Sequence, residues 1–321
     1  MTAWPNHEAP WREWREAMSG ARMHHGWILA GKAGLGKRAF AEAAARELVA
    51  EPGIPQPKGN HPDILVLTYL PKDEKEEKKR DEGQSYEVKR NISVAQIRGL
   101  QQRLTTRPTL GSRRVVIIDS ADDMERSASN ALLKSLEEPP RGTFFVLIAH
   151  RPGRLLPTIR SRCRVLRFPL LSDEEIARLL LDEELQADGA ARSVAIAAAG
   201  GSLGAAKLFI EEEMGPVANL LRQIVREGDP NMVLRGSLVQ AIGARPNRVR
   251  MQAVFDLARG IVAEEARQAS AGVNPGLIET HVQLVELAAQ APTYNFDPGL
   301  LAMEIGGLLA RAAEASERAD A

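Results

Sequence analysis

Residues 31–38, with the sequence GKAGLGKR, almost match the phosphate-binding loop pattern G-x-x-x-x-G-K-[ST]. In that pattern the glycines let backbone N–H groups close around phosphates, the lysine reaches the terminal phosphates, and the hydroxyl holds Mg²⁺. Gly31, Gly34, Gly36 and Lys37 fit this pattern, but Arg38 occupies the hydroxyl position. Arginine has only hydrogen-bond donors and cannot ligate a metal. The segment therefore predicts a degenerate nucleotide-binding loop; the alternative is a glycine-rich turn without a ligand.

Short apolar runs alternate with helical patterns through the first half of the chain. Strands are expected at residues 27–30, 63–69, 114–119, 143–149 and 163–168, with helices at 39–49, 92–104 and 127–138. This alternation predicts an α/β unit with a parallel sheet and right-handed crossovers. Residues 72–82 are all polar or charged and predict a solvated loop or a disordered insertion. From Ser172 onward the strand signals disappear, and the remainder is expected to be all helical.

Asp119 closes the apolar run at residues 114–119. P-loop ATPases place a metal-binding carboxylate at this point, at the carboxyl edge of the sheet beside the loop. Asp119 is therefore a candidate nucleotide-site residue, and the alternative is a helix cap or turn former. The next residue is Ser120, where a glutamate would orient the attacking water in an active ATPase.

Charge is distributed unevenly along a chain whose formal net charge is zero. Residues 1–170 contain 29 Lys+Arg against 20 Asp+Glu, so the remainder is acidic. Between Arg151 and Arg167 there are six arginines and no acidic residue. Arginine favours bidentate contact with phosphate or carboxylate, so Arg151 and Arg154 are candidates for contact with DNA or a neighbouring subunit. The alternative is a solvated basic face that pairs with acids of its own fold.

The remaining composition indicates an ordinary globular protein of the cytoplasm. A single cysteine excludes an internal disulfide framework and suits a reducing compartment. The sequence has no apolar run of about 18 residues, so no membrane span is expected. The first residues lack the basic start and apolar stretch of a signal peptide.

Several motifs together resemble the clamp-loader branch of the AAA+ ATPases. They are NALLKSLEEPP at residues 130–140, FFVLIA at 144–149, LPTIRSRC at 156–163, HHGW at 24–27, HPD at 61–63 and ISVAQIR at 92–98. The Ser-Arg-Cys triplet at this distance after the Leu-Glu-Glu-Pro-Pro helix is the most specific of them. The resemblance covers residues 20–210 well.

The resemblance implies three domains. They would be a RecA-like AAA+ module at residues 1–169, a small helical lid at 170–213 and an all-α collar at 214–321. Members of the branch form rings that open a sliding clamp and place it on primer–template DNA. The implied partners are therefore gamma/tau and delta subunits, the clamp and DNA, without a membrane.

The Ser161-Arg162-Cys163 triplet carries the implied catalytic role. By resemblance, Arg162 would reach the ATP of a neighbouring subunit as an arginine finger, while Ser161 and Cys163 would be structural members of the motif. Positive charge supplied in trans to a phosphoryl transition state raises rates by about 10³–10⁵. Cys163 fits a small buried residue better than a nucleophile.

Other positions also lack residues that the active ATPases of the branch carry. Gly204 stands where the lid arginine is expected, and His150 replaces a sensor Thr or Asn. The branch includes rigid, non-hydrolysing stator subunits, and the resemblance to these implies that the chain is not an ATPase by itself, with residual ATP or ADP binding left open. The alternatives are an active gamma/tau-type ATPase and a P-loop enzyme or DNA-binding module unrelated to clamp loading. Residues 50–62 contain no cysteine, which excludes a four-cysteine zinc site. His24, His25 and His61 could in principle bind a metal, but adjacent histidines do not face one way on a helix, so no metal is expected.

Overall fold

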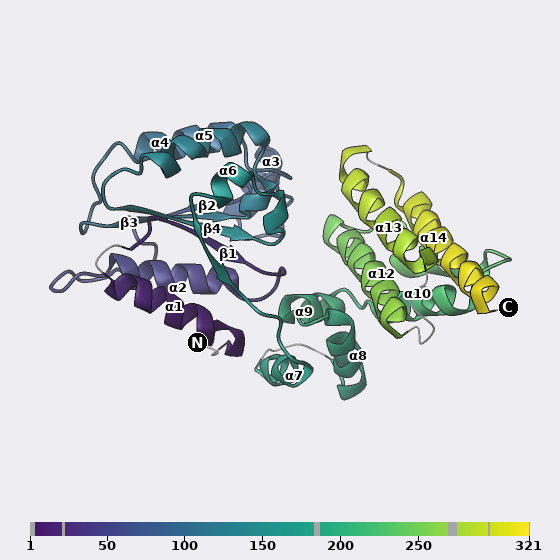
Figure 1. The fold of residues 1–321 in the computed structure, drawn as a ribbon. Coiled ribbons are helices and arrows are strands. Elements are labelled where there is room, and N and C mark those ends of the chain that lie inside the picture. Colours follow the sequence, from purple (N-terminus) through teal and green to yellow (C-terminus); the bar gives the residue numbers. More distant parts are fainter. Residues whose placement is uncertain (1–3, 21–22, 183–186, 269–274, 295, 321) are drawn as a thin grey trace. The chain divides into compact units, whose positions relative to one another are not determined.

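The computed structural model describes residues 4–20, 23–182, 187–268, 275–294 and 296–320. The chain divides into two compact units, residues 1–171 and 172–321. Each unit has its own elements (Figure 1) and is described separately.

The first unit is built around a five-stranded parallel sheet with the strand order β2-β3-β4-β1-β5. Its strands are β1 (Gly26–Ala30), β2 (Ile64–Leu67), β3 (Arg114–Asp119), β4 (Thr143–Ala149) and β5 (Arg164–Arg167). Its helices are η1 (Pro5–His7), α1 (Glu8–Ser19), α2 (Lys37–Val49), α3 (Glu74–Asp81), α4 (Val94–Arg103), η2 (Ala121–Asp123), α5 (Arg126–Glu137), η3 (Pro152–Arg154) and α6 (Pro157–Arg160). The predicted α/β architecture with a parallel sheet is confirmed.

Helices cover both faces of this sheet, with α1 and α2 on one side and α4 and α5 on the other (Figure 1). All five residues of β1 are buried, as expected for a central strand that packs on both faces. On one face Trp27 of β1 meets Trp14 of α1 at 5.3 Å between ring centroids. On the other, Ile28 shares a core with Ile97 of α4 and Leu132 of α5. The loop after β1 therefore begins at the end of a strand that is packed on both faces.

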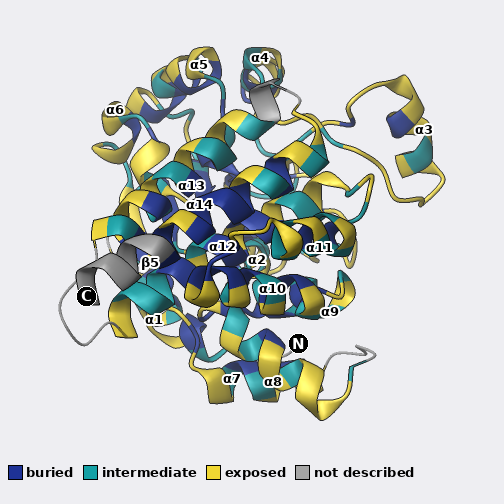
Figure 2. Ribbon diagram, turned by 90° about the vertical axis from the view of Figure 1, so that its right-hand side faces the viewer, coloured by how far each residue is buried: buried dark blue, intermediate teal, exposed yellow. Residues whose placement is uncertain are grey.

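The charged segment at residues 72–82 forms a helix, so the predicted loop or disordered insertion was wrong. Helix α3 begins after Asp73, whose side chain accepts a hydrogen bond from the Glu76 N–H at 3.0 Å. Acidic residues fill its first turn and basic residues its last, which suits the helix dipole. Glu76 is buried, and its carboxylate accepts a hydrogen bond from the Glu87 N–H at 2.6 Å. This bond links the helix to the segment that follows it. Most of α3 remains exposed (Figure 2).

The described part of the second unit is helical, as predicted. Its helices are α7 (Asp173–Leu181), α8 (Gly189–Ala199), α9 (Leu203–Glu211), α10 (Gly215–Glu227), α11 (Val233–Ile242), α12 (Arg248–Gln268), α13 (Pro275–Tyr294) and α14 (Pro298–Asp320). Ser172 begins the unit with a capping box to Glu175. One apolar core joins Ala195 and Phe209 to residues of α10–α14. The finer boundaries of lid and collar, at 169/170 and 213/214, stay predictions.

Candidate functional site

The glycine-rich segment forms a tight turn between β1 and α2. Gly31, Gly34 and Gly36 have φ angles of 159°, 77° and 73°, so the last two lie in the left-handed region that favours glycine. A Cβ atom on Gly31 would lie 2.7 Å from the Phe168 carbonyl oxygen, so a side chain there would clash with the backbone. The expected strand–loop–helix arrangement of a phosphate loop is therefore present.

Lys37, the first residue of α2, turns back onto its own loop. Its ammonium donates to the carbonyl oxygens of Gly31 and Lys32, both at 2.6 Å. The residue is only 2% exposed. Burial lowers the pKa of Lys37 to about 8, although the carboxylates of Asp119 and Asp122 act to raise it. The lysine is thus engaged with backbone oxygens of the loop.

Arg38 forms one ion pair within α2 and a second one with the end of β3. Its Nε lies 2.6 Å from Glu42 Oε1, and its Nη1 lies 3.2 Å from Asp119 Oδ2. The predicted site residues Lys37, Arg38 and Asp119 are therefore brought together. The guanidinium contacts the carboxylate that would otherwise be offered to a metal, so these side chains do not fit a bound Mg²⁺.

The segment before α1 covers the loop, which sequence reasoning missed. The Trp4 ring packs so closely on Gly36 that a Cβ there would lie 2.7 Å from ring atoms. Trp4 stacks on His7 at 5.3 Å between ring centroids, and His7 Nε2 donates to the Leu35 carbonyl at 2.8 Å. Asn6 donates to the Pro169 carbonyl at 3.2 Å. Burial lowers the pKa of His7, although its hydrogen bond to Leu35 opposes this. The sequence shows only Trp4 and Pro5 before a run of polar residues, which does not reveal this packing.

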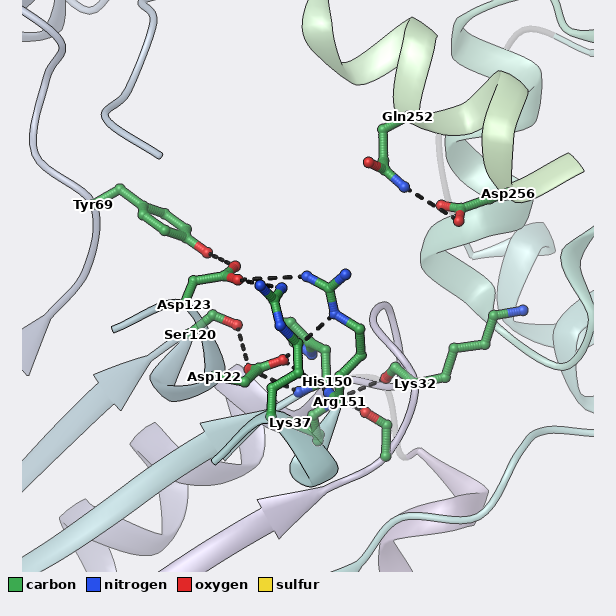
Figure 3. A network of polar contacts seen from close by, with 12 residues as sticks. Lys32, Lys37, Tyr69, Ser120, Asp122, Asp123, His150, Arg151, Gln252 and Asp256 are labelled. Carbon is green, nitrogen blue, oxygen red and sulfur yellow. Dashed lines mark hydrogen bonds and ion pairs between the residues drawn. The ribbon is translucent and has the colours of Figure 1, made fainter. Parts of the chain in front are cut away.

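Asp122 is an acidic group of the site that the sequence did not single out (Figure 3). Its carboxylate accepts from Ser120 Oγ at 3.0 Å and from the backbone N–H groups of His150 at 3.1 Å and Arg151 at 2.8 Å. Burial acts to raise its pKa, but these hydrogen bonds hold the pKa below its ordinary value. The Ser120 hydroxyl and the His150 backbone N–H thus both contact Asp122. Burial also lowers the pKa of His150, with Lys37 adding to the effect.

The side chains of Arg151 and Arg154 converge on Asp123. Their guanidinium nitrogens lie 3.4 and 3.3 Å from Asp123 Oδ1, and the Tyr69 hydroxyl donates to Asp123 Oδ2 at 2.6 Å. Figure 3 shows Arg151, Asp123 and Tyr69 in one network. The arginine side chains remain 59% and 56% exposed. They pair within their own fold while their outer faces stay accessible, and contact with DNA or a subunit stays a prediction.

The Ser161-Arg162-Cys163 triplet lies in the turn between α6 and β5. The Arg162 side chain is 36% exposed, and its Nη2 lies 2.6 Å from Glu137 Oε1 at the end of α5. Ser161 Oγ donates to the Thr158 carbonyl at 3.1 Å. Cys163 packs against the core, and burial raises the pKa of its thiol to about 12. A thiol with so high a pKa is a poor nucleophile, in agreement with a structural role.

The described residues contain no group of three or more His, Cys, Asp and Glu side chains placed to hold a metal ion. In the same part of the chain, no helix is long and apolar enough to cross a membrane. Gly204 is the second residue of α9 and leaves no cationic side chain at that position.

Comparisons with family models and with known proteins point to the same family. The family model described as "DNA polymerase III, delta subunit" matches residues 6–172. A DNA polymerase III subunit delta′ from Pseudomonas aeruginosa is 36% identical over 196 residues, which cover 56% of this chain and 55% of that protein. A gamma subunit from Buchnera aphidicola is 30% identical over 166 residues, which cover 50% of this chain and 42% of that protein.

A solved gamma-subunit-related protein of DNA polymerase III from Thermotoga maritima has 17% identity and a TM-score of 0.47, covering 95% of this chain and all of that one. The chain spans about half the length of the curated relatives that it matches. Because the family model covers just over half of the chain, the chain belongs to the DNA polymerase III delta-subunit family and resembles its delta-prime members.

Proposed function

We propose that this chain is a delta-prime-type stator of a sliding-clamp loader and a non-catalytic subunit of a DNA polymerase holoenzyme. In this role it joins gamma/tau and delta subunits in a ring that places the clamp on primer–template DNA. The family match and the delta′ relative support this assignment.

The contact between Arg38 and Asp119 carries the non-hydrolysing part of the proposal. A guanidinium replaces the hydroxyl ligand of Mg²⁺ and also engages the metal-binding carboxylate at 3.2 Å. Lys37 meanwhile donates to two loop carbonyls. Ser120, which follows Asp119, points its hydroxyl to Asp122 and offers no carboxylate to orient a water. Each of these features opposes ATP hydrolysis by this chain.

The proposed contribution to catalysis is Arg162, offered to the ATP of a neighbouring subunit. Its side chain is partly exposed on the turn before β5, and its planar guanidinium suits contact with phosphate oxygens. A positive charge there would stabilise the charge that develops on the transferred phosphoryl group. The chain would then activate a partner while lacking the means to hydrolyse ATP itself.

Reconstitution with gamma/tau and delta subunits tests both parts of the proposal. The isolated chain should show no ATP turnover, and Arg162→Ala should leave assembly intact while slowing ATP hydrolysis by the complex about 10-fold or more. Arg160→Ala is the matched control, because Arg160 is an exposed arginine at the end of α6, two residues before Arg162. Loss of assembly with unchanged turnover per assembled ring would instead make Arg162 a structural residue.

An active gamma/tau-type ATPase is the second candidate function, favoured by the 30% identity to the Buchnera gamma subunit. It requires that Arg38 release Asp119 and that Lys37 leave the loop carbonyls when nucleotide enters. Turnover above about 1 per second by the pure chain would support this alternative. Equilibrium binding of ATP and ADP to the same preparation measures whether nucleotide binds without hydrolysis.

A further inference from the structure

The turn that bears Arg162 is anchored to the sheet on its backbone side. Gly26 of β1 lies directly beneath it, and a Cβ on Gly26 would come within 3.0 Å of both the Arg162 carbonyl oxygen and Cys163 Sγ. The Arg162 N–H donates to the Ile159 carbonyl at 3.1 Å. The buried Cys163 side chain adds a second attachment to the core. The backbone of Arg162 is therefore fixed before any partner arrives.

The backbone of Glu137 is also anchored, through the packing of helix α5. Glu137 is the last residue of α5, which packs against α6, and the preceding Leu136 is buried in the core. The Leu136 carbonyl accepts a hydrogen bond from His25 Nε2 at 2.8 Å, which holds the end of the helix to the start of β1. The Glu137 side chain itself is 49% exposed. Its carboxylate thus extends from a rigid helix end toward solvent.

Two nitrogens of the Arg162 guanidinium, Nη1 and Nη2, contact neighbouring oxygen atoms. Nη2 lies 2.6 Å from Glu137 Oε1, while Nη1 donates to the Thr158 carbonyl at 3.0 Å and to Ser161 Oγ at 3.4 Å. Arginine has five N–H donors, so other donors remain for an outside anion. A long side chain loses rotamer entropy when it is ordered, and these contacts order Arg162 in advance.

We propose that Glu137 is a positioning residue that sets the direction in which Arg162 is presented to a neighbouring subunit's ATP. This inference rests on the proposed trans role of Arg162. Glu137 acts through its hydrogen bond to Nη2 and does not contact the nucleotide. Pre-ordering of this kind raises the rate of the chemical step without strengthening ATP binding, because it matters only where phosphoryl charge develops.

The test measures ATP hydrolysis by the reconstituted complex with Glu137→Ala and Glu137→Gln. Glu137→Ala should lower kcat about 2- to 5-fold, a range suited to a half-exposed ion pair, and leave KM for ATP unchanged. Glu137→Gln keeps an oxygen that accepts from Nη2 and should restore kcat to within about 2-fold of the parent. Glu138→Ala is the matched control, because Glu138 is the adjacent exposed glutamate.

A double variant separates positioning from general destabilisation. Arg162→Ala with Glu137→Ala should be no slower than Arg162→Ala alone, because Glu137 acts only through Arg162. A further loss in the double variant, or a kcat that is unchanged or higher in Glu137→Ala, overturns the inference. If Arg162→Ala itself leaves kcat unchanged, the proposed trans role has failed. If Arg162→Ala is slow and Glu137→Ala is not, only the role of Glu137 has failed.

Discussion

Replacing Lys37 by methionine should change how the stability of the first unit depends on pH. In the folded chain burial lowers the pKa of Lys37 from 10.5 to about 8. Between these two values the unfolded chain binds a proton that the folded chain does not. Raising the pH through this window therefore favours the folded state of the parent. Lys37→Met has no such proton, so the parent gains stability relative to the variant.

The size of this gain follows from the pKa shift. A shift from 10.5 to about 8 corresponds to about 3 kcal/mol, since each pKa unit represents about 1.4 kcal/mol. The hydrogen bonds from Lys37 to Gly31 and Lys32 add a constant amount to the difference in the free energy of unfolding between parent and variant. The predicted quantity is the change in that difference, about 3 kcal/mol between about pH 8 and pH 10.5, with little change below.

Tryptophan fluorescence gives a selective assay for the first unit. All four tryptophans of the chain lie at or before residue 27. Urea unfolding of parent and Lys37→Met, followed by fluorescence at several pH values from about 7 to 10.5, yields the free energy of unfolding at each. Lys58→Met is the control, because Lys58 is exposed, and its curve should run parallel to that of the parent.

Parallel curves for the parent and Lys37→Met would refute the reasoning, since they would mean that Lys37 is not desolvated in the folded chain. The same assay reports on nucleotide binding. An anion that engages Lys37 raises its folded-state pKa and removes the extra pH dependence. If saturating ADP leaves that dependence unchanged, ADP does not engage Lys37.

Three further predictions concern other parts of the site. Arg38→Thr should restore a hydroxyl yet leave the isolated chain without ATP turnover, because Ser120 still cannot orient a water; measurable turnover would contradict this. Trp4→Ala should destabilise the first unit by about 1–3 kcal/mol in the urea assay, since it removes the stack on His7 and the packing on Gly36; an unchanged midpoint would argue against that packing. Arg154→Glu should lower the stability of the isolated chain by no more than about 1 kcal/mol, because the Arg154 side chain is more than half exposed, yet reduce DNA-stimulated ATP hydrolysis by the complex in a salt-dependent way. A large drop in melting temperature with unchanged stimulation would mean that Arg154 serves only its own fold.

The sequence alone was sufficient for the architecture of the first unit. Buried strands appeared as short apolar runs, and the glycine pattern at residues 31–36 marked the turn after the first of them. Asp119 was placed at the loop because the carboxyl ends of parallel strands share one edge of a sheet. These features depend on local periodicity and on a small number of permitted topologies, which a single sequence carries.

Helix α3 was not predicted, because some of the contacts that stabilise it involve residues outside the helix. The segment has no apolar stripe, so hydrophobic periodicity gave no helical signal. The structure supplies Asp73 as a cap and the Glu87 backbone as a partner for Glu76. The choice between helix and loop therefore depended on capping and on one contact across the segment.

Only the tertiary structure decided how the charged side chains of the site are used. Arg38 and Asp119 are 81 positions apart, and Arg162 and Glu137 are 25 apart, yet each pair forms a direct ion pair. The sequence identified the arginines but allowed Arg151 to face either a partner or its own fold, and the structure shows it paired with Asp123. An ion pair depends on distance and orientation between side chains from separate elements. Those quantities exist only after the sheet and helices have packed.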